Sequence, residues 1–369
     1  MPKSISHHLS RPASKTDEIA GPVSGDPGAG ASASASAQHQ QYASLSLRAA
    51  WQLTSPQSWI ASIGPVLVGG LSAFVLTQWP LARMVRLTLS GGASFGSLYR
   101  PVLSVRSLLL WLLMLVCAVA AQSAANTLND YKDFVAGTDT EQNCVDTTDA
   151  SIIYNHLAPK TARNFGIACL IVALVAGVVV AAFSSLWLLV VGVVGIAALM
   201  TYSYGPAPVS YLPLGEVVSG VTFGLLIAVG TFVALTRSWS WMLLLPCVQQ
   251  VISIGLIMMT NNTCDIERDT EAGRRTLPVL LGRRRSLAAL AIGNMLALIA
   301  LGVFALLLGG FYCLPVIAGC FFVSGLMRRF ITLHFDVQDR PRAMQTSVAL
   351  ARVLAATNCA VLLLAVLWR

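Results

Sequence analysis

The sequence predicts an all-α, polytopic membrane protein. Apolar residues make up 56% of its 369 residues and charged residues only 11%, whereas soluble globular chains carry about 25% charged residues. Apolar runs of about twenty residues, the length that a helix needs to cross a bilayer, recur from residue 57 to the C-terminus. We therefore expect about nine transmembrane helices, at residues 57–79, 105–129, 163–183, 185–204, 214–235, 239–262, 286–308, 311–333 and 344–367.

The segment before the first span has a different composition. Residues 1–46 are rich in Ser, Ala, Gly, Pro and Gln and contain few large apolar side chains, which predicts a disordered tail. They lack the basic stretch and apolar core of a signal peptide, so the first span itself is expected to direct insertion. The remaining residues, 47–369, form the expected transmembrane domain, in which 80–104 is an extra loop between the first two spans.

The formal net charge of +8 does not indicate a nucleic-acid partner. The basic residues are spread over the loops, whereas most of the acidic residues lie in two short stretches, 130–149 and 265–271. Lys and Arg are more frequent in the loops that share a side with the N-terminal tail, and this positive-inside bias places both acidic stretches on the cytoplasmic face. We expect a multi-pass protein of a bacterial inner membrane. The eight cysteines form no paired spacing and predict neither a disulfide framework nor a zinc site.

The first acidic stretch begins at the end of an apolar run. Asn126, Asn129, Asp130 and Asp133 stand at i, i+3, i+4 and i+7, so on a helix they share one face. Four oxygen-bearing side chains at the rim of an apolar helix are energetically costly there. Their presence indicates that a polar partner, most simply a cation, meets them.

The second acidic stretch repeats this pattern. Asn262, Asp265 and Asp269 stand at i, i+3 and i+7, and a glycine follows the last Asp by four residues in both stretches. The shared pattern N-x-x-[ND]-x-x-x-D-x-x-x-G covers 126–137 and 262–273, in each case at the cytoplasmic end of an even-numbered span. A solvated acidic loop would not explain this duplication. We therefore expect the two helix ends to face each other and to form one site.

Carboxylate and amide oxygens are the ligands that Mg²⁺ prefers, and this ion typically bridges a few carboxylates to substrate phosphates. A diphosphate held in this way becomes a better leaving group, and Arg274 and Arg275 could supply further anion contacts. A substrate that combines a diphosphate with a membrane-soluble part is a polyprenyl diphosphate. Its ionisation gives an allylic cation, which an electron-rich acceptor attacks while the membrane excludes water.

The alternative from another class, a divalent-cation transporter, would place acidic residues along a path across the membrane rather than on one face.

At these residues the chain resembles the UbiA superfamily of intramembrane prenyltransferases. The likeness rests on Asn-Asp-Tyr-x-Asp-x-x-x-Gly-x-Asp (129–139), on Asn-Asn-x-x-Asp-Ile-x-x-Asp-x-x-x-Gly (261–273) and on Tyr-x-x-Gly-Pro-x-Pro with a later Leu-Gly-Glu (202–216). These three motifs are most similar to those of the 1,4-dihydroxy-2-naphthoate polyprenyltransferase branch of menaquinone biosynthesis. They are also similar to those of its vertebrate relative that forms menaquinone-4. The resemblance implies nine transmembrane helices around a central cavity, two Mg²⁺ ions, and transfer of a polyprenyl group with release of diphosphate and CO₂ to give demethylmenaquinone. Sibling acceptors are 4-hydroxybenzoate, homogentisate and menadiol.

The resemblance also implies roles for individual residues. The catalytic group would be Asp130, Asp133, Asp265 and Asp269, and these four with Asn126 and Asn129 would bind the metal. Substrate-binding candidates are Asn126, Tyr131, Asp139, Lys160, Arg163, Tyr202, Tyr204, Glu216, Asn262, Arg274 and Arg275. For several of these a structural role is an equal alternative, because tyrosines are common at membrane interfaces and an acid at a helix N-terminus is favoured by the helix dipole.

The chain departs from the family pattern in three places, one of which is Gly273-Arg274 where the family has Gly-Lys after the second motif. Ser55-Pro56 stands where the family often has Arg-Pro, and no base follows the first motif before Lys160 and Arg163. Arg352, inside the last span, is left without an assigned role, since a long basic side chain there can extend to the interface or pair with an acid.

Overall fold

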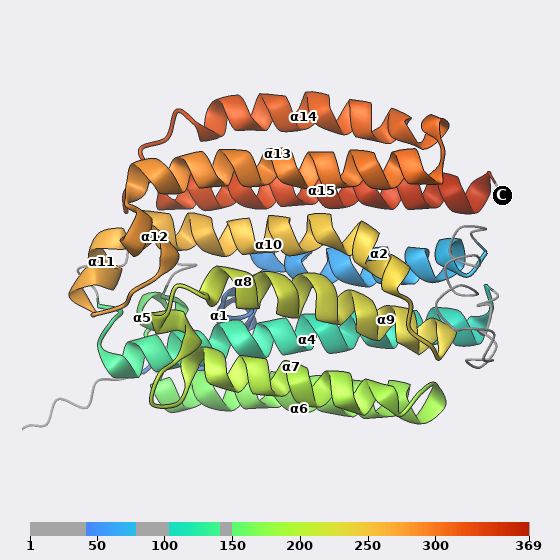
Figure 1. Ribbon diagram of the computed structural model, residues 1–369. Coiled ribbons are helices and arrows are strands. Elements are labelled where there is room, and N and C mark those ends of the chain that lie inside the picture. Colours follow the sequence, from blue (N-terminus) through green and yellow to red (C-terminus); the bar gives the residue numbers. More distant parts are fainter. Residues whose placement is uncertain (1–41, 79–102, 141–149, 369) are drawn as a thin grey trace, which may run out of the picture. The chain divides into compact units, whose positions relative to one another are not determined.

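The computed structural model describes residues 42–78, 103–140 and 150–368. Most of the expected N-terminal tail and of the extra loop at 80–104 therefore lies outside the described residues. Figure 1 shows a bundle of long helices, and the described residues contain no β-strand beyond an isolated bridge between Ala43 and Leu157. This bridge, together with a hydrogen bond from the Ala43 N–H to the His156 carbonyl at 2.9 Å, holds the last residues of the expected tail beside residues 156–157.

The α-helices are α1 (Leu47–Leu53), α2 (Ile60–Leu76), α4 (Val105–Ala136), α5 (Ser151–Tyr154), α6 (Pro159–Phe183), α7 (Trp187–Ser203), α8 (Gly215–Ser219), α9 (Ile227–Thr236), α10 (Leu244–Cys264), α11 (Ile266–Glu271), α12 (Leu277–Leu281), α13 (Arg283–Leu308), α14 (Leu314–Phe330) and α15 (Arg340–Leu367). Single 3₁₀ turns are η1 (Pro56–Ser58), η2 (Val209–Tyr211), η4 (Trp241–Leu243) and η5 (Gly310–Cys313), and the π-helical segment η3 (Gly220–Leu226) joins α8 to α9.

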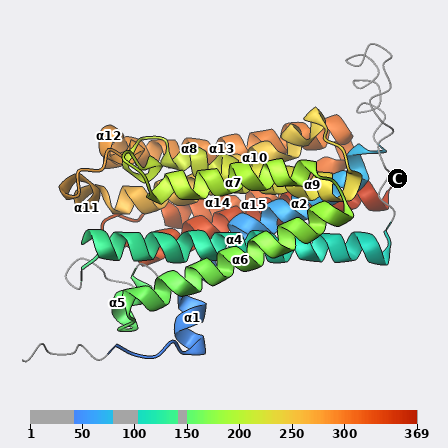
Figure 2. The ribbon, with the colours of Figure 1, turned by 90° about the horizontal axis from the view of Figure 1, so that it is seen from below.

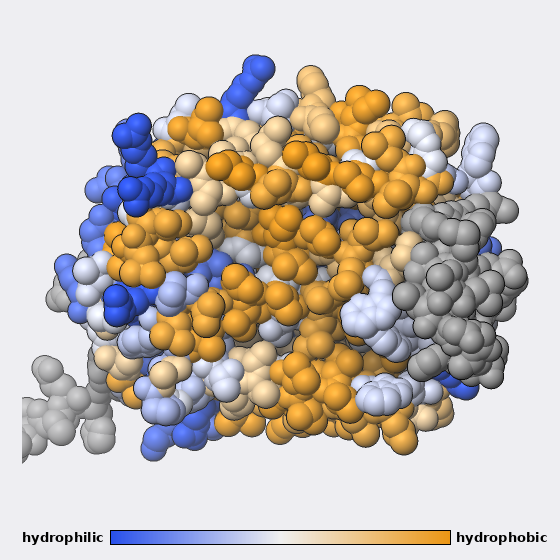
Figure 3. All heavy atoms as spheres, viewed as in Figure 1, coloured by the Kyte–Doolittle hydropathy of each residue, from blue (hydrophilic) through white to orange (hydrophobic). Residues whose placement is uncertain are grey.

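The expected membrane spans are present. In the described part of the chain, eight helical stretches are long and apolar enough to cross a membrane. A ninth apolar helix, α7, is shorter at 17 residues and occupies the predicted span 185–204. The prediction of an all-α protein with about nine transmembrane helices is confirmed. Figure 3 shows apolar side chains over the middle of the bundle and hydrophilic ones at the end that carries α11 and α12, as expected of a multi-pass membrane protein.

The long helices lie side by side in a consistent order. α13, α14 and α15 form one side of the bundle, and α4, α6 and α7 form the other, with α2, α10 and the α8–α9 unit between them (Figure 1). The short helices α1 and α5 pack together against the polar end of α4 (Figure 2). The bundle therefore has a polar end, which holds both acidic stretches, and an apolar body.

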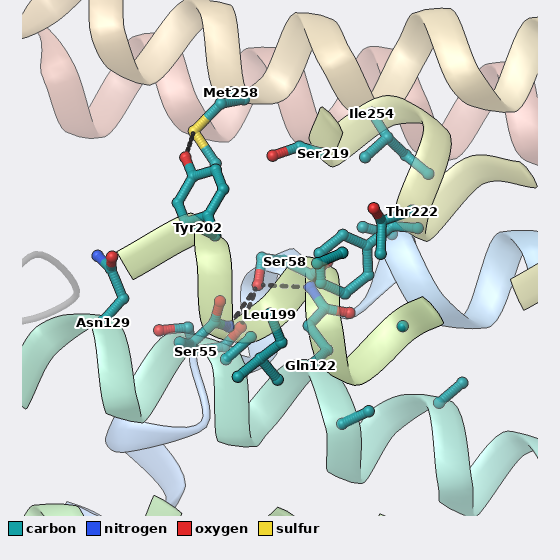
Figure 4. A pocket seen from close by; sticks show the side chains of 18 of the residues that line it. Ser55, Ser58, Gln122, Asn129, Leu199, Tyr202, Ser219, Thr222, Ile254 and Met258 are labelled. Atoms are coloured by element: carbon teal, nitrogen blue, oxygen red, sulfur yellow. Dashed lines mark hydrogen bonds between the residues drawn. The ribbon is translucent and has the colours of Figure 1, made fainter. Parts of the chain in front are cut away.

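The π-helical segment lies very close to α10. A Cβ at Gly220 would lie 2.5 Å from the backbone oxygen of Val251, and one at Gly224 would lie 2.7 Å from its backbone nitrogen. Only glycine permits this approach, which follows the small-xxx-small pattern of membrane helix packing. The close contact fixes the position of Ser219 and Thr222, which point towards the interior space described below (Figure 4).

Candidate active site

The repeated sequence pattern corresponds to a repeated local structure. α4 continues to Ala136 rather than ending at the expected residue 129, so the first acidic stretch occupies its last turns. Gly137, with φ of +73°, ends this helix, and Gly273, with φ of +72°, follows α11 in the same way. In each case the next residue, Thr138 or Arg274, donates its backbone N–H to the carbonyl of the Asp five residues earlier, at 3.0 and 2.8 Å.

This arrangement is the Schellman cap of a helix C-terminus, in which glycine is favoured because the residue must adopt a left-handed conformation. The Asp-x-x-x-Gly spacing is therefore a helix-ending device as well as a source of carboxylates. It places the residue after each glycine beside the main-chain carbonyl of the Asp in the preceding turn.

The two acidic stretches meet, as expected from the sequence, and arginines join them. The Arg274 guanidinium forms an ion pair with Asp133 of the first stretch, and its Nη1 lies 3.6 Å from Asp269 Oδ1 of its own stretch. Arg268 makes a second connection, with Nη2 at 2.8 Å from Asp265 Oδ2 and Nη1 at 3.5 Å from Asp139 Oδ1. Each arginine therefore holds one carboxylate from each motif.

A third arginine comes from the last helix. Arg340, in the first turn of α15, places its Nε 3.4 Å from Asp265 Oδ2 and donates from Nη2 to Asn261 Oδ1 at 2.6 Å. Sequence reasoning missed both Arg268 and Arg340. Arg268 could have been found as a base i+3 from Asp265, whereas nothing in the sequence near Arg340 shows that α15 starts beside the second motif.

The carboxylates of the second stretch differ in their environment. Asp269 is 1% exposed and accepts a hydrogen bond from Thr276 Oγ1 at 3.2 Å. Burial raises the pKa of its carboxyl to about 6, although the neighbouring Arg274 guanidinium favours the charged form. Glu267 instead points away and pairs with Arg283 at 2.7 Å, and this hydrogen bond lowers its pKa. Glu267 is thus a surface residue within an otherwise buried motif.

Amide side chains organise the walls of the site. Asn129 donates to Asp133 Oδ2 at 3.1 Å and accepts from Ser203 Oγ at 2.8 Å, which ties α4 to the end of α7. Asn262 donates to Glu216 Oε1 at 2.9 Å. Glu216 is 5% exposed, so this bond fixes a buried acid between α8 and α10.

A cavity of about 1050 Å³ opens from this polar group into the bundle. Its wall on α4 extends from Met114 to Asp133, which corresponds to about 28 Å of helix. The polar end includes Asp130, Asp133 and Arg274, while the other end is lined by apolar residues of α6, α7 and α9. Among the residues of α7, only Leu188 and Ser203 are buried, because one side of this helix faces the cavity and the other faces outward.

The middle of the cavity carries neutral polar groups (Figure 4). Tyr202 extends into it, with its hydroxyl 3.2 Å from Met258 Sδ. Gln122 donates to the carbonyl and hydroxyl oxygens of Ser58 at 2.8 and 3.1 Å, and Asn126 donates to the same hydroxyl at 3.2 Å. Ser58 and Gln122 were not among the residues predicted from the sequence, although Gln122 is a polar residue within an apolar run.

The structure gathers some of the candidate residues and separates others. The candidates that line the cavity are Asn126, Asn129, Asp130, Asp133, Asp139, Tyr202, Asn262 and Arg274, and Asp265 and Asp269 contact arginines of its wall. The candidates that lie away from its lining are Tyr131, Lys160, Arg163, Tyr204, Glu216 and Arg275. Tyr131 packs on the α1–α5 cluster, and Tyr204 lies beside Lys132, whose Nζ is 5.9 Å from its ring centre.

Within the described residues, no three His, Cys, Asp or Glu side chains converge as a preformed metal site requires. A magnesium ion bound mainly by substrate phosphates and water needs only one or two carboxylates. The paired carboxylates around Arg268 and Arg274, with the neighbouring Asn129, provide oxygen ligands of this kind.

Comparisons with known proteins agree with this arrangement. Residues 87–349 match the UbiA prenyltransferase family. The chain is 32% identical over 249 residues to the 1,4-dihydroxy-2-naphthoate octaprenyltransferase of Bacillus subtilis (strain 168), covering 68% of this chain and 71% of that protein. It is 30% identical over 177 residues to UbiA prenyltransferase domain-containing protein 1 of Danio rerio, covering 46% and 51% of the two chains. A solved structure of a UbiA homolog from Archaeoglobus fulgidus, bound to DMAPP and Mg²⁺, matches with a TM-score of 0.51 and 16% identity over 85% of this chain and 98% of that one.

Proposed function

Because the chain belongs to the UbiA prenyltransferase family, we propose that it transfers a polyprenyl group from its diphosphate to 1,4-dihydroxy-2-naphthoate. The products are diphosphate, CO₂ and demethylmenaquinol, which is the reduced form of demethylmenaquinone. The observation that carries this proposal is the meeting of two acidic helix ends at the head of one long, largely apolar cavity. Two observations support 1,4-dihydroxy-2-naphthoate over 4-hydroxybenzoate, homogentisate and menadiol as the acceptor. One is the name of the Bacillus subtilis relative, and the other is the resemblance of the motifs at 129–139, 261–273 and 202–216 to those of that branch.

Atoms and electrons balance in this reaction without a further reactant. The prenyl carbon leaves the diphosphate, which departs with the bonding electron pair, and forms a carbon–carbon bond to the acceptor ring. The carboxylate is lost as CO₂, and the electron pair of the broken bond returns to the ring. The chain therefore has to bind and orient two substrates and to exclude water from the allylic cation.

Magnesium fits the oxygen ligands at the polar end, and the Archaeoglobus fulgidus homolog was solved with Mg²⁺ and a prenyl diphosphate. We propose that Asn126, Asn129, Asp130, Asp133, Asp265 and Asp269 supply ligands to two such ions. When bound, the ions neutralise the diphosphate and stabilise it as a leaving group.

The side chains of the polar end would position the diphosphate. Arg274 and Arg268 already lie between the two acidic groups and line the cavity, so their guanidinium donors would reach phosphate oxygens there. Tyr202 lies beyond them in the cavity, where its ring face would meet the allylic cation. We place this end on the cytoplasmic face of a bacterial inner membrane, because the loops at this end carry more Lys and Arg.

The apolar end of the cavity would hold the prenyl tail. A Cβ at Gly195 on α7 would be 3.6 Å from Leu226 Cδ2, so a larger side chain there enters this end. We expect Gly195→Phe to shift the preference in kcat/KM towards shorter prenyl diphosphates by about 10-fold. The measurement compares donors of two to eight prenyl units in proteoliposomes.

The matched control is Gly325→Phe on α14. Gly325 is exposed, lies away from the cavity lining, and has open space around an added Cβ. This variant should keep the donor preference of the original chain. The assignment of the apolar end to the prenyl tail would be contradicted if Gly195→Phe kept the original donor preference. It would also be contradicted if both variants showed the same shift in donor preference.

Complementation tests the choice of acceptor. Expressed in a bacterial strain that lacks its 1,4-dihydroxy-2-naphthoate prenyltransferase, the chain should restore menaquinone. Failure to restore it, together with ubiquinone formation in a strain that lacks the 4-hydroxybenzoate enzyme, would identify a sibling acceptor. Divalent-metal uptake without either product would indicate a transporter.

A further inference from the structure

Arg352 is a charged residue deep within a membrane span. It lies twelve residues after Arg340 on α15, which is about 18 Å along the helix. A charged side chain at such depth is costly unless it faces a polar or water-filled space. Arg352 meets this condition, because it is exposed and lines the cavity.

The position of Arg352 follows from one face of α15. Pro341, Gln345, Val348 and Arg352, at intervals of three or four residues, all line the cavity. Arg352 is the member of this face that lies farthest from the polar end. Its Nη2 donates to the backbone oxygen of Gln57 at 3.1 Å, across the junction between α15 and the start of α2.

The groups beside Arg352 connect it to the first acidic motif. Ser58, the neighbour of Gln57, shares its hydroxyl with Gln122 and Asn126. Asn126 lies one helical turn before Asn129 and Asp130. Arg352 is therefore within the middle part of the cavity. This part adjoins the polar end that would hold the diphosphate, and the acceptor ring would lie there.

Arg352 also differs in its pairing from the arginines of the polar end. Arg268, Arg274 and Arg340 all form ion pairs with Asp residues. In the described part of the chain, Arg352 has no carboxylate within ion-pair distance, and its hydrogen bond to Gln57 uses one of five N–H donors. A guanidinium placed in this way is suited to bind a planar carboxylate with two parallel hydrogen bonds.

We propose that Arg352 binds the carboxylate of the aromatic acceptor and is the residue that selects an acidic acceptor. This inference rests on the proposed function, since it requires an acceptor that carries a carboxylate. When the carboxyl group leaves as neutral CO₂, its attraction to Arg352 is lost, which favours release of the product.

The test compares ligands that differ only in the carboxylate. Equilibrium binding of 1-hydroxy-2-naphthoate and 1-naphthol is measured with the full chain in proteoliposomes, together with the KM values for acceptor and prenyl diphosphate. The original chain should prefer the carboxylated ligand by about 10- to 100-fold. Arg352→Gln should remove most of this preference and raise the acceptor KM by the same factor, with the prenyl diphosphate KM unchanged.

Two further variants keep the test decisive. Arg352→Lys retains the charge and should recover part of the preference, and thermal unfolding of all variants shows whether they remain folded. Arg329→Gln, on the exposed last turn of α14 and away from the cavity, should bind both ligands as the original chain does. A preference for the carboxylated ligand that persists in Arg352→Gln would overturn the proposal. If the original chain binds with the expected preference but does not prenylate 1,4-dihydroxy-2-naphthoate, the proposed function fails while this inference stands.

Discussion

Asp133→Asn is expected to lower kcat/KM for prenyl transfer by about 10²- to 10³-fold. Asp133 lines the cavity, accepts from Asn129 and pairs with Arg274, so it links the first motif to the second. The substitution keeps the size of the side chain but removes a charge that would bind metal and orient Arg274. Initial rates in proteoliposomes at saturating Mg²⁺ measure the effect, and higher Mg²⁺ concentrations should recover part of the activity.

Glu267→Gln provides the matched control, because Glu267 belongs to the second acidic motif but pairs with Arg283 at the surface. Its removal should change kcat/KM by less than about twofold, as is usual for an exposed ion pair. Equal decreases in kcat/KM in Asp133→Asn and Glu267→Gln would show that the overall negative charge of the polar end matters, rather than the particular carboxylates. Full activity in Asp133→Asn would contradict the proposed role of the first motif.

Arg274→Gln is the second change with a large expected effect, a decrease of about 100-fold in kcat/KM for the prenyl diphosphate. Arg274 joins Asp133 and Asp269 and lies over the Tyr211 ring, with its Cζ 5.1 Å from the ring centre. The loss should also weaken inhibition by free inorganic diphosphate. Arg274→Lys should recover little, because one ammonium group cannot contact both carboxylates and the diphosphate.

The neighbouring Arg275 separates a specific contact from a general effect of positive charge. Its backbone donates to the Tyr211 carbonyl, whereas its side chain is exposed and lies away from the cavity lining. Arg275→Gln should leave the KM for prenyl diphosphate within about twofold. A large rise in the KM for prenyl diphosphate in Arg275→Gln, without one in Arg274→Gln, would contradict this assignment. It would show that Arg275, and not Arg274, contacts the diphosphate.

Much of the fold followed from the sequence because membrane spans are recognised by length and apolarity alone. The exact end of α4 did not, since the apolar run stops before the helix does. Gly137 determines that end through its left-handed cap, whereas in the sequence this glycine stands out only as part of a repeat. The same device at Gly273 explains why the two motifs share their spacing.

The site was predicted well where residues share one helix face and poorly where contacts are distant in sequence. Spacing brought Asn129, Asp130 and Asp133 together, but it could not show that Arg340 reaches Asp265 from the last helix. Tyr204 was a substrate-binding candidate, but it lies beside Lys132 and away from the cavity lining. Such placement depends on tertiary packing, which a local pattern does not encode.

The most direct test of the account uses an acceptor labelled in its carboxyl carbon. Purified chain in proteoliposomes receives a polyprenyl diphosphate, Mg²⁺ and 1,4-dihydroxy-2-naphthoate, and labelled CO₂, diphosphate and prenylated product are quantified together. We expect equal amounts of all three, none without Mg²⁺, and strongly reduced amounts with Asp133→Asn. A prenylated product that retains the labelled carboxyl, or turnover that is independent of Mg²⁺ and of Asp133, would contradict the account.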